Sequence, residues 1–209
     1  MPVSAYLRAT ILLIAAAVAL FGSAGSLAIA TFWLYWAILV AVFVAAFALL
    51  DRGLVQERMR PGGRPTPLGL RLLNVVLLTH WIVAGLDRGW LQALGLFTIV
   101  AGYALVFWAM MTNRFFSSVV RIQSDRGQYV VTSGPYALVR HPGYSAGILI
   151  LAASGVALGS WLAAAFLIAI TVPFLFYRVI HEDRVLQTRL DGYADYARRV
   201  RWRLVPGIW

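Results

Sequence analysis

The sequence predicts an all-α fold, a polytopic bundle of about five to six transmembrane helices. Of its 209 residues, 61% are hydrophobic and only 12% are charged, whereas a soluble domain is roughly 45–50% apolar and about 25% charged. The 42 residues from Ala9 to Leu50 contain no charged side chain, and crossing a bilayer takes about 20 apolar residues. The composition therefore indicates an integral membrane protein, which we expect to form a single domain over residues 1–209.

The amino-terminal half contains four apolar segments of membrane-spanning length. We expect helices at about 3–22, 27–50, 68–86 and 90–112. Shorter segments rich in glycine, proline or charge separate them, so 22–26 and 87–89 are predicted turns and 51–67 is a predicted loop. The apolar run that follows Met1–Arg8 is too long for a cleavable signal peptide. We therefore expect residues 1–112 to supply four transmembrane helices.

The carboxyl-terminal half alternates between polar and apolar segments. Residues 113–142 are polar and irregular, and the uncharged stretch that follows runs to Tyr177 with a break at Gly159-Ser160. This pattern predicts a membrane hairpin whose second helix continues past Arg178. From His181 to Arg203 the apolar residues recur at helical spacing, which is typical of an amphipathic interfacial helix.

The distribution of charge predicts the orientation in the membrane. All 18 basic residues are arginine, and 17 of them fall on one side of the predicted topology, with only Arg88 on the other. The positive-inside rule then places both termini and both long loops in the cytoplasm. We interpret the net charge of +10 as a signal of orientation and of contact with membrane lipids, not of nucleic-acid binding. Since there is no cysteine, disulfides, thiol nucleophiles and cysteine-ligated metals are excluded.

Polar residues gather in two segments, 113–144 and 178–196, which the last hairpin separates. Because a hairpin brings its two ends together, we expect these segments to form one site at the boundary between cytosol and lipid. No GxGxxG, P-loop or HExxH motif is present. In the third span, His80 and Asn74 are interpreted as interhelical hydrogen-bonding residues.

The carboxyl-terminal motifs carry a resemblance to a known family. The run SGPYALVRHPGYSAG, followed after the hairpin by RVIHED and GYADYARRV, resembles the isoprenylcysteine carboxyl methyltransferase family of membrane enzymes. The similarity covers Asn113 to Trp209. Its RHPxY element is shared with phosphatidylethanolamine N-methyltransferases and, in similar form, with NADPH-dependent sterol reductases, so it marks a superfamily more firmly than a reaction.

The resemblance implies a cytoplasmic pocket for S-adenosylmethionine and a lipophilic substrate that enters from the bilayer, with no metal ion and no obligate protein partner. The matching cofactor-binding positions are Gln123, Gln128, Tyr129, Val130, Val131, Tyr136, His141, Pro142, Gly143, Tyr144 and Glu182. Arg178 matches the arginine that receives the substrate. An isoprenylcysteine carboxylate is already ionised at neutral pH, so the reaction needs an arginine to hold it, a role that fits Arg178 and Arg140.

Three alternatives remain open from the sequence. N-methylation of a phospholipid amine would need a general base, for which His141, His181 or Glu182 is available. A reductase using NADPH would need a proton donor such as Tyr136, Tyr144 or Tyr193. A small transporter or assembly factor would use the polar segments for contacts with a partner and would have no affinity for a cofactor.

Overall fold

The computed structural model describes residues 3–59, 67–86 and 92–209, and every regular element in this part of the chain is helical. Eight α-helices follow in order, with two short 3-10 turns, 124–126 and 134–137, between the fifth and the sixth. The α-helices are α1 (Val3–Ala24), α2 (Ala30–Leu49), α3 (Arg52–Met59), α4 (Pro67–Leu86), α5 (Gln92–Thr112), α6 (Pro142–Ala157), α7 (Trp161–Arg189) and α8 (Tyr193–Arg199). The predicted all-α class is confirmed.

The long helices have the length and composition of membrane spans. Tyr6–Ala24, Ala30–Leu49, Gln92–Thr112 and Trp161–Arg189 are each long and apolar enough to cross a bilayer, and Asn74–Leu86 and Pro142–Ala157 are shorter apolar helices. Large apolar side chains point outward from them, including Phe97 at 72% exposure. Such a surface is suited to lipid, so the protein is an integral membrane protein with the predicted number of segments.

Two predicted boundaries are wrong, and α3 is the first of them. The segment read as a loop contains this helix, which begins where the Asp51 side chain accepts a hydrogen bond from the backbone N–H of Leu54 at 3.1 Å. Leu54 and Val55 are buried against Leu50 and Met110. In the sequence, the few apolar residues of this face lie among charged residues, so their pattern does not indicate a helix. The predicted turn at 87–89 lies outside the described residues.

The second correction concerns the carboxyl-terminal amphipathic segment. In place of one helix over 181–203, α7 continues without interruption to Arg189, and the chain then turns at Gly192, where φ is +80°. A glycine accommodates this left-handed conformation, which other residues rarely adopt. The turn lets α8 fold back and bury Tyr193 and Tyr196.

Small residues allow the helices of the carboxyl-terminal half to approach closely. A Cβ atom added at Gly95 of α5 would collide with the backbone of Ala157 in α6, and one added at Gly155 would collide with Ala164 in α7. Contacts of this kind are typical of membrane helix packing, where close backbone approach supplies much of the attraction. They fix α5, α6 and α7 as the rigid support of the polar segments.

A buried polar chain connects four helices away from those segments. His80 of α4 contacts the Ser154 hydroxyl at 2.7 Å and the Ala163 carbonyl at 3.3 Å. Ser154 also meets the Tyr35 hydroxyl at 2.7 Å, and Trp81 donates to that hydroxyl at 3.3 Å. The predicted interhelical role of His80 is confirmed, whereas Asn74 is exposed on the surface of α4.

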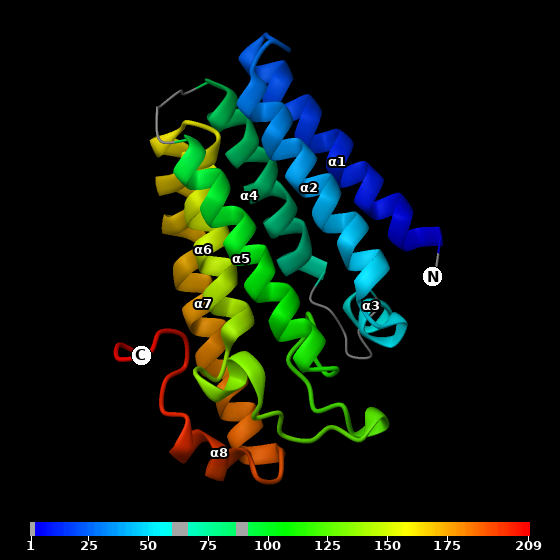
Figure 1. Cartoon of the computed structure of the whole chain (residues 1–209), viewed down its shortest axis with the longest axis vertical. Coiled ribbons are helices and arrows are strands. Elements are labelled where there is room, and N and C mark those ends of the chain that lie inside the picture. The colour runs from blue at the N-terminus through cyan, green and yellow to red at the C-terminus, as the bar shows by residue number, and fades with distance from the viewer. Residues whose placement is uncertain (1–2, 60–66, 87–91) are drawn as a thin grey trace.

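The polar elements lie at one end of the bundle. In Figure 1, α3, the irregular segment 113–141 and α8 lie at the same end of the bundle, and the first residues of α1 are directed toward that end. The α1–α2 and α6–α7 turns lie at the other end. This arrangement agrees with the predicted topology. It brings segment 113–141 alongside the end of α7.

Candidate active site

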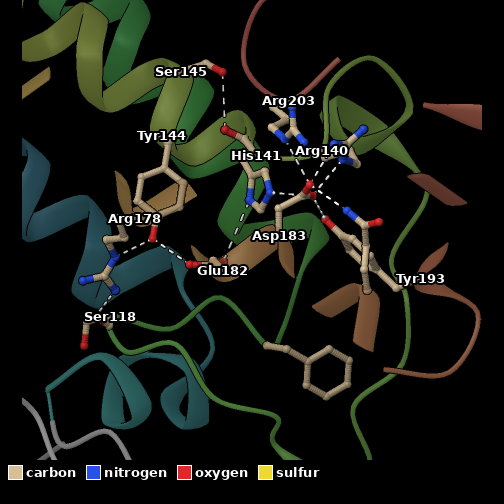
Figure 2. A network of polar contacts seen from close by, with 12 residues as sticks. Ser118, Arg140, His141, Tyr144, Ser145, Arg178, Glu182, Asp183, Tyr193 and Arg203 are labelled. Carbon is tan, nitrogen blue, oxygen red and sulfur yellow. Dashed lines mark hydrogen bonds and ion pairs between the residues drawn. The ribbon is translucent and has the colours of Figure 1, made fainter. Parts of the chain in front are cut away.

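The two polar segments predicted to converge are in direct contact. Arg178, near the polar end of α7, donates from Nε to the Tyr144 hydroxyl at 2.6 Å and from Nη2 to the backbone carbonyl of Ser118. The Tyr144 hydroxyl in turn donates to Oε2 of Glu182 at 2.7 Å (Figure 2). Arg178 and Glu182 lie one helical turn apart, and the Tyr144 hydroxyl bridges them.

Asp183 is the centre of a second, more deeply buried group of contacts. Its side chain is 1% exposed, and its two oxygens accept hydrogen bonds from side chains of four different segments (Figure 2). The donors are Arg140, His141, Gln187, Tyr193 and Arg203. A single carboxylate thus joins the loop that carries Arg140 and His141 just before α6 (the RHP loop), α7, α8 and the carboxyl-terminal tail (residues 200–209).

The guanidinium of Arg140 is held entirely by contacts within the protein. It meets Asp183 through Nε at 2.8 Å and Nη2 at 2.9 Å, and Nη1 donates to the carbonyls of Val200 at 2.9 Å and Arg201 at 2.8 Å. Burial disfavours the charged form of this group, but the hydrogen bonds to Asp183 outweigh that effect and raise the pKa of Arg140. The geometry makes Arg140 a clamp between α7 and the tail.

His141 stands between the two groups of contacts. Its Nε2 lies 3.2 Å from Oδ1 of Asp183, and its Nδ1 lies 3.9 Å from Oε1 of Glu182. The backbone N–H groups of Arg140 and His141 donate to the carbonyls of Trp202 and Arg203, each at 2.9 Å. Pro142 then starts α6 at a position where its missing N–H costs nothing.

Tyr193 contributes to the same buried group from α8. Its hydroxyl donates to Asp183 at 3.1 Å. Burial, followed by the negative charge of Asp183, raises the pKa of Tyr193 above its ordinary value. The phenol therefore stays protonated and keeps donating over the physiological pH range.

Gln123 is buried inside the polar segment and is hydrogen-bonded to neighbouring residues. It is 1% exposed, its amide donates to the Phe115 carbonyl at 2.6 Å, and its oxygen accepts from Arg126 at 2.6 Å. Its backbone N–H donates to the side chain of Gln128 at 2.6 Å. These contacts fold residues 115–128 into a compact loop.

The other predicted cofactor positions vary in exposure. Tyr129 is 59% exposed and its ring meets Phe115 edge-on at 5.0 Å, while Val130 and Val131 are half-buried. Tyr136 is buried, and its carbonyl accepts a hydrogen bond from Tyr196 at 2.7 Å. A Cβ at Gly143 would collide with the Phe116 ring, so any larger residue here would displace that ring.

A surface cavity of about 590 Å³ opens between the polar segment and α7. Its lining residues are Val120, Arg121, Ile122, His181, Val185 and Arg189. The volume lies within the range of about 300–1,000 Å³ that is usual for small-molecule sites. Gln123 and Glu182 directly follow lining residues in the sequence, so the cavity adjoins the predicted cofactor positions without being lined by them.

Sequence reasoning missed several of these residues. Asp183 stands in the HED run but gave no sign of its burial, and Arg121 and Arg189 lie in the two converging segments but were not singled out as site residues. Among the described residues, no group of three or more His, Cys, Asp or Glu side chains is placed to hold a metal ion.

Comparison with known proteins shows that the part of the chain containing this site is similar to a known family. Residues 93–188 match the isoprenylcysteine carboxyl methyltransferase (ICMT) family. The matched segment runs from α5 nearly to the end of α7 and contains the RHP loop, Arg178 and Asp183. The predicted resemblance to the ICMT family is therefore confirmed for this part of the chain.

Curated relatives extend the similarity over more of the chain. Protein-S-isoprenylcysteine O-methyltransferase B of Arabidopsis thaliana is 28% identical over 126 residues, which is 59% of this chain and 60% of the relative. A probable protein-S-isoprenylcysteine O-methyltransferase of Oryza sativa is 28% identical over 62% of this chain and 64% of its own length. The cobalt-zinc-cadmium resistance protein CzcN of Cupriavidus metallidurans is 37% identical over 37% of this chain and 36% of its own. The chain thus spans less than two thirds of these relatives.

A solved structure shares the overall fold. The eukaryotic intramembrane Ras methyltransferase ICMT superposes with a TM-score of 0.63 at 17% sequence identity, covering 96% of this chain and 73% of that one. The ICMT-like arrangement of helices therefore includes the amino-terminal half, which lies outside the matched family segment.

Proposed function

We propose that this protein is a membrane methyltransferase that uses S-adenosylmethionine to methylate the carboxylate of an isoprenylated cysteine or a similar lipophilic acceptor. The observation that carries the proposal is the position of Arg178. This cation lies near the polar end of a membrane span, held by Tyr144 and the Ser118 carbonyl, beside the Glu182 carboxylate. Ionisable groups in such positions usually serve a site.

The residues present fit the proposed cofactor. Its sulfonium is cationic, and the Glu182 carboxylate, with a side chain 25% exposed, stands at the edge of the buried contacts. The cavity beside it is large enough for a nucleoside and offers apolar walls from Val120, Ile122 and Val185. When bound, the cofactor would supply an electrophilic methyl group. We therefore assign the cavity, together with Glu182 and the RHP loop, to cofactor binding.

The acceptor would be held by Arg178. A carboxylate needs no base, so the task of the protein is to orient it and to exclude water. Charge-assisted hydrogen bonds from a guanidinium suit this task. On the same helix Phe174, Tyr177 and Ile180 are 54%, 70% and 43% exposed, which offers an apolar approach to Arg178 from the bilayer for an isoprenyl chain.

Arg140 has a different part in this proposal. Its hydrogen-bonding groups are used by Asp183 and by two carbonyls of the tail. We propose that it positions His141 and the tail and that it makes no contact with the acceptor. The whole site would face the cytoplasm, because 17 of the 18 arginines lie on its side of the predicted topology.

The decisive experiment supplies purified protein with radiolabelled S-adenosylmethionine and either a prenylcysteine or a phosphatidylethanolamine vesicle. We expect label in the prenylcysteine product that mild alkali releases as methanol, as an ester requires. Alkali-stable label in the phospholipid would replace the proposal by N-methylation. Binding of NADPH in place of S-adenosylhomocysteine would point to a reductase, and binding of neither would favour a transporter or assembly factor.

A further inference from the structure

One wall of the cavity is held by a residue of the amino-terminal half. Glu57 of α3 is 7% exposed, and Oε2 accepts a hydrogen bond from Nη2 of Arg121 at 2.9 Å. Oε1 accepts from Nε of Arg121 at 3.2 Å and from the Ser117 hydroxyl at 3.0 Å. Two parallel bonds between a guanidinium and a carboxylate fix the direction as well as the distance of the pair.

Arg121 connects this contact to the cavity. It lines the cavity together with its neighbours Val120 and Ile122, opposite residues of α7. Its Nη1 also donates to Asp125 at 2.7 Å, but the Asp125 side chain is 61% exposed. The hydrogen bonds to Glu57, and after them those to Asp125, raise the pKa of Arg121. Its charge is therefore permanent, and the buried partner is the stronger anchor because water screens the exposed one.

Apolar packing keeps α3 in place beneath the loop. Leu54 and Val55 belong to a buried cluster with Leu50 and Met110, and Phe116 of the polar segment packs against it. Phe116 also lies against Gly143 at the start of α6. The amino-terminal half thus reaches the site by two routes, one ionic and one apolar, and Glu57 lies outside the segment 93–188 that matches the ICMT family.

We propose that Glu57 is a positioning residue for the cavity: by holding Arg121 and Ser117 it sets the shape of the wall formed by residues 120–122, and with it the affinity for the nucleoside cofactor. The proposal rests on the function proposed above. It assigns a role in the site to the amino-terminal half of the chain, which carries none of the motifs that resemble the ICMT family.

The test compares Glu57→Gln with Asp125→Asn, which removes the charge of the exposed partner of the same guanidinium. Binding of S-adenosylhomocysteine to detergent-solubilised protein is measured by calorimetry, and hydrogen exchange of residues 115–125 is measured without ligand. Glu57→Gln removes the charge of the buried partner of Arg121, and hydrogen bonds between charged groups are worth more than those between neutral ones. We expect Glu57→Gln to weaken S-adenosylhomocysteine binding about tenfold or more and to speed exchange in the loop, while Asp125→Asn changes both by less than about twofold.

Kinetics separate positioning from a loss of folded protein. A displaced wall raises KM for S-adenosylmethionine with little change in kcat, whereas partial unfolding lowers apparent kcat at unchanged KM. If Glu57→Gln does not fold, Glu57→Asp, which keeps the charge but withdraws it by one methylene, is expected to show the same changes more weakly.

Equal affinity and equal loop exchange in Glu57→Gln and the unaltered protein would overturn the inference. So would an effect of the same size in Asp125→Asn. Failure of the unaltered protein to bind S-adenosylhomocysteine would instead refute the proposed function, so the two failures are distinguishable.

Discussion

The Tyr144 hydroxyl donates a 2.7 Å hydrogen bond to Glu182 and accepts one of 2.6 Å from Arg178. Tyr144 belongs to α6 and both partners belong to α7, so the contact ties the hairpin together at its polar end. In the proposed function, Glu182 faces the cofactor and Arg178 faces the acceptor. The phenol thus links the two binding roles.

Removing this link should reduce the rate. Tyr144→Phe keeps the ring but loses two hydrogen bonds to charged groups, each worth about 1.5–3 kcal/mol. We expect kcat/KM for the prenylcysteine to fall about ten- to a hundredfold, measured by radiolabel transfer. Tyr6→Phe, on a ring of α1 that is 48% exposed, is the matched control and should stay within about twofold. Unchanged kinetics in Tyr144→Phe would contradict the linking role.

Arg178→Ala should separate binding from turnover. The substitution removes the cation assigned to the acceptor and leaves Glu182 and the cavity in place, so S-adenosylhomocysteine affinity is expected to stay within about threefold while kcat/KM falls at least about 10²-fold. Calorimetry and initial rates measure the two quantities. Arg184→Ala, at an exposed position of the same helix, should alter neither. Equal loss of binding and turnover would reject the assignment of Arg178 to the acceptor.

The membrane spans were predictable because each is a continuous apolar run, and the composition alone indicates α1, α2, α5 and α7. The convergence of 113–144 with Arg178 was also predictable, since a hairpin joins its own ends. The short helix α3 was not, because its buried face consists of few apolar residues among charged ones.

The contacts that organise the site were beyond local patterns. The sequence around Asp183 does not indicate whether this carboxylate faces water or is buried among five hydrogen-bond donors. The pairing of Glu57 with Arg121 joins residues that are 64 positions apart. Predicting either requires the three-dimensional packing of α3, α7, α8 and the tail. Sequence motifs therefore located the site but left its supporting contacts undetected.

Asp183 should dominate the stability of the carboxyl-terminal half. Asp183→Ala leaves the buried side chains of Arg140 and His141 without the carboxylate that both contact. Breaking a buried ion pair in this way costs about 3–5 kcal/mol of stability. We expect a marked loss in the free energy of unfolding, measured by denaturant titration in detergent with intrinsic fluorescence.

The matched control for this prediction is Asp195→Ala. Asp195 pairs with Arg198 on the exposed face of α8, where both side chains are more than half exposed, so the expected cost is below about 1 kcal/mol. A cost of that size for Asp183→Ala would show that the buried contacts contribute little to stability.

The buried chain through His80 should matter for stability and not for binding. Ser154→Ala removes the hydroxyl that contacts both His80 and Tyr35 at 2.7 Å, and an unsatisfied buried polar group costs about 1–3 kcal/mol. Because this chain lies within the bundle, away from Arg178 and the cavity, we expect a lower free energy of unfolding with unchanged S-adenosylhomocysteine affinity. Thr98→Ala serves as the control, since its hydroxyl contacts only a carbonyl of its own helix among the contacts described. A change in affinity in Ser154→Ala that exceeds about threefold would show that the core of the bundle is coupled to the site, because a purely local loss of packing has no other route to it.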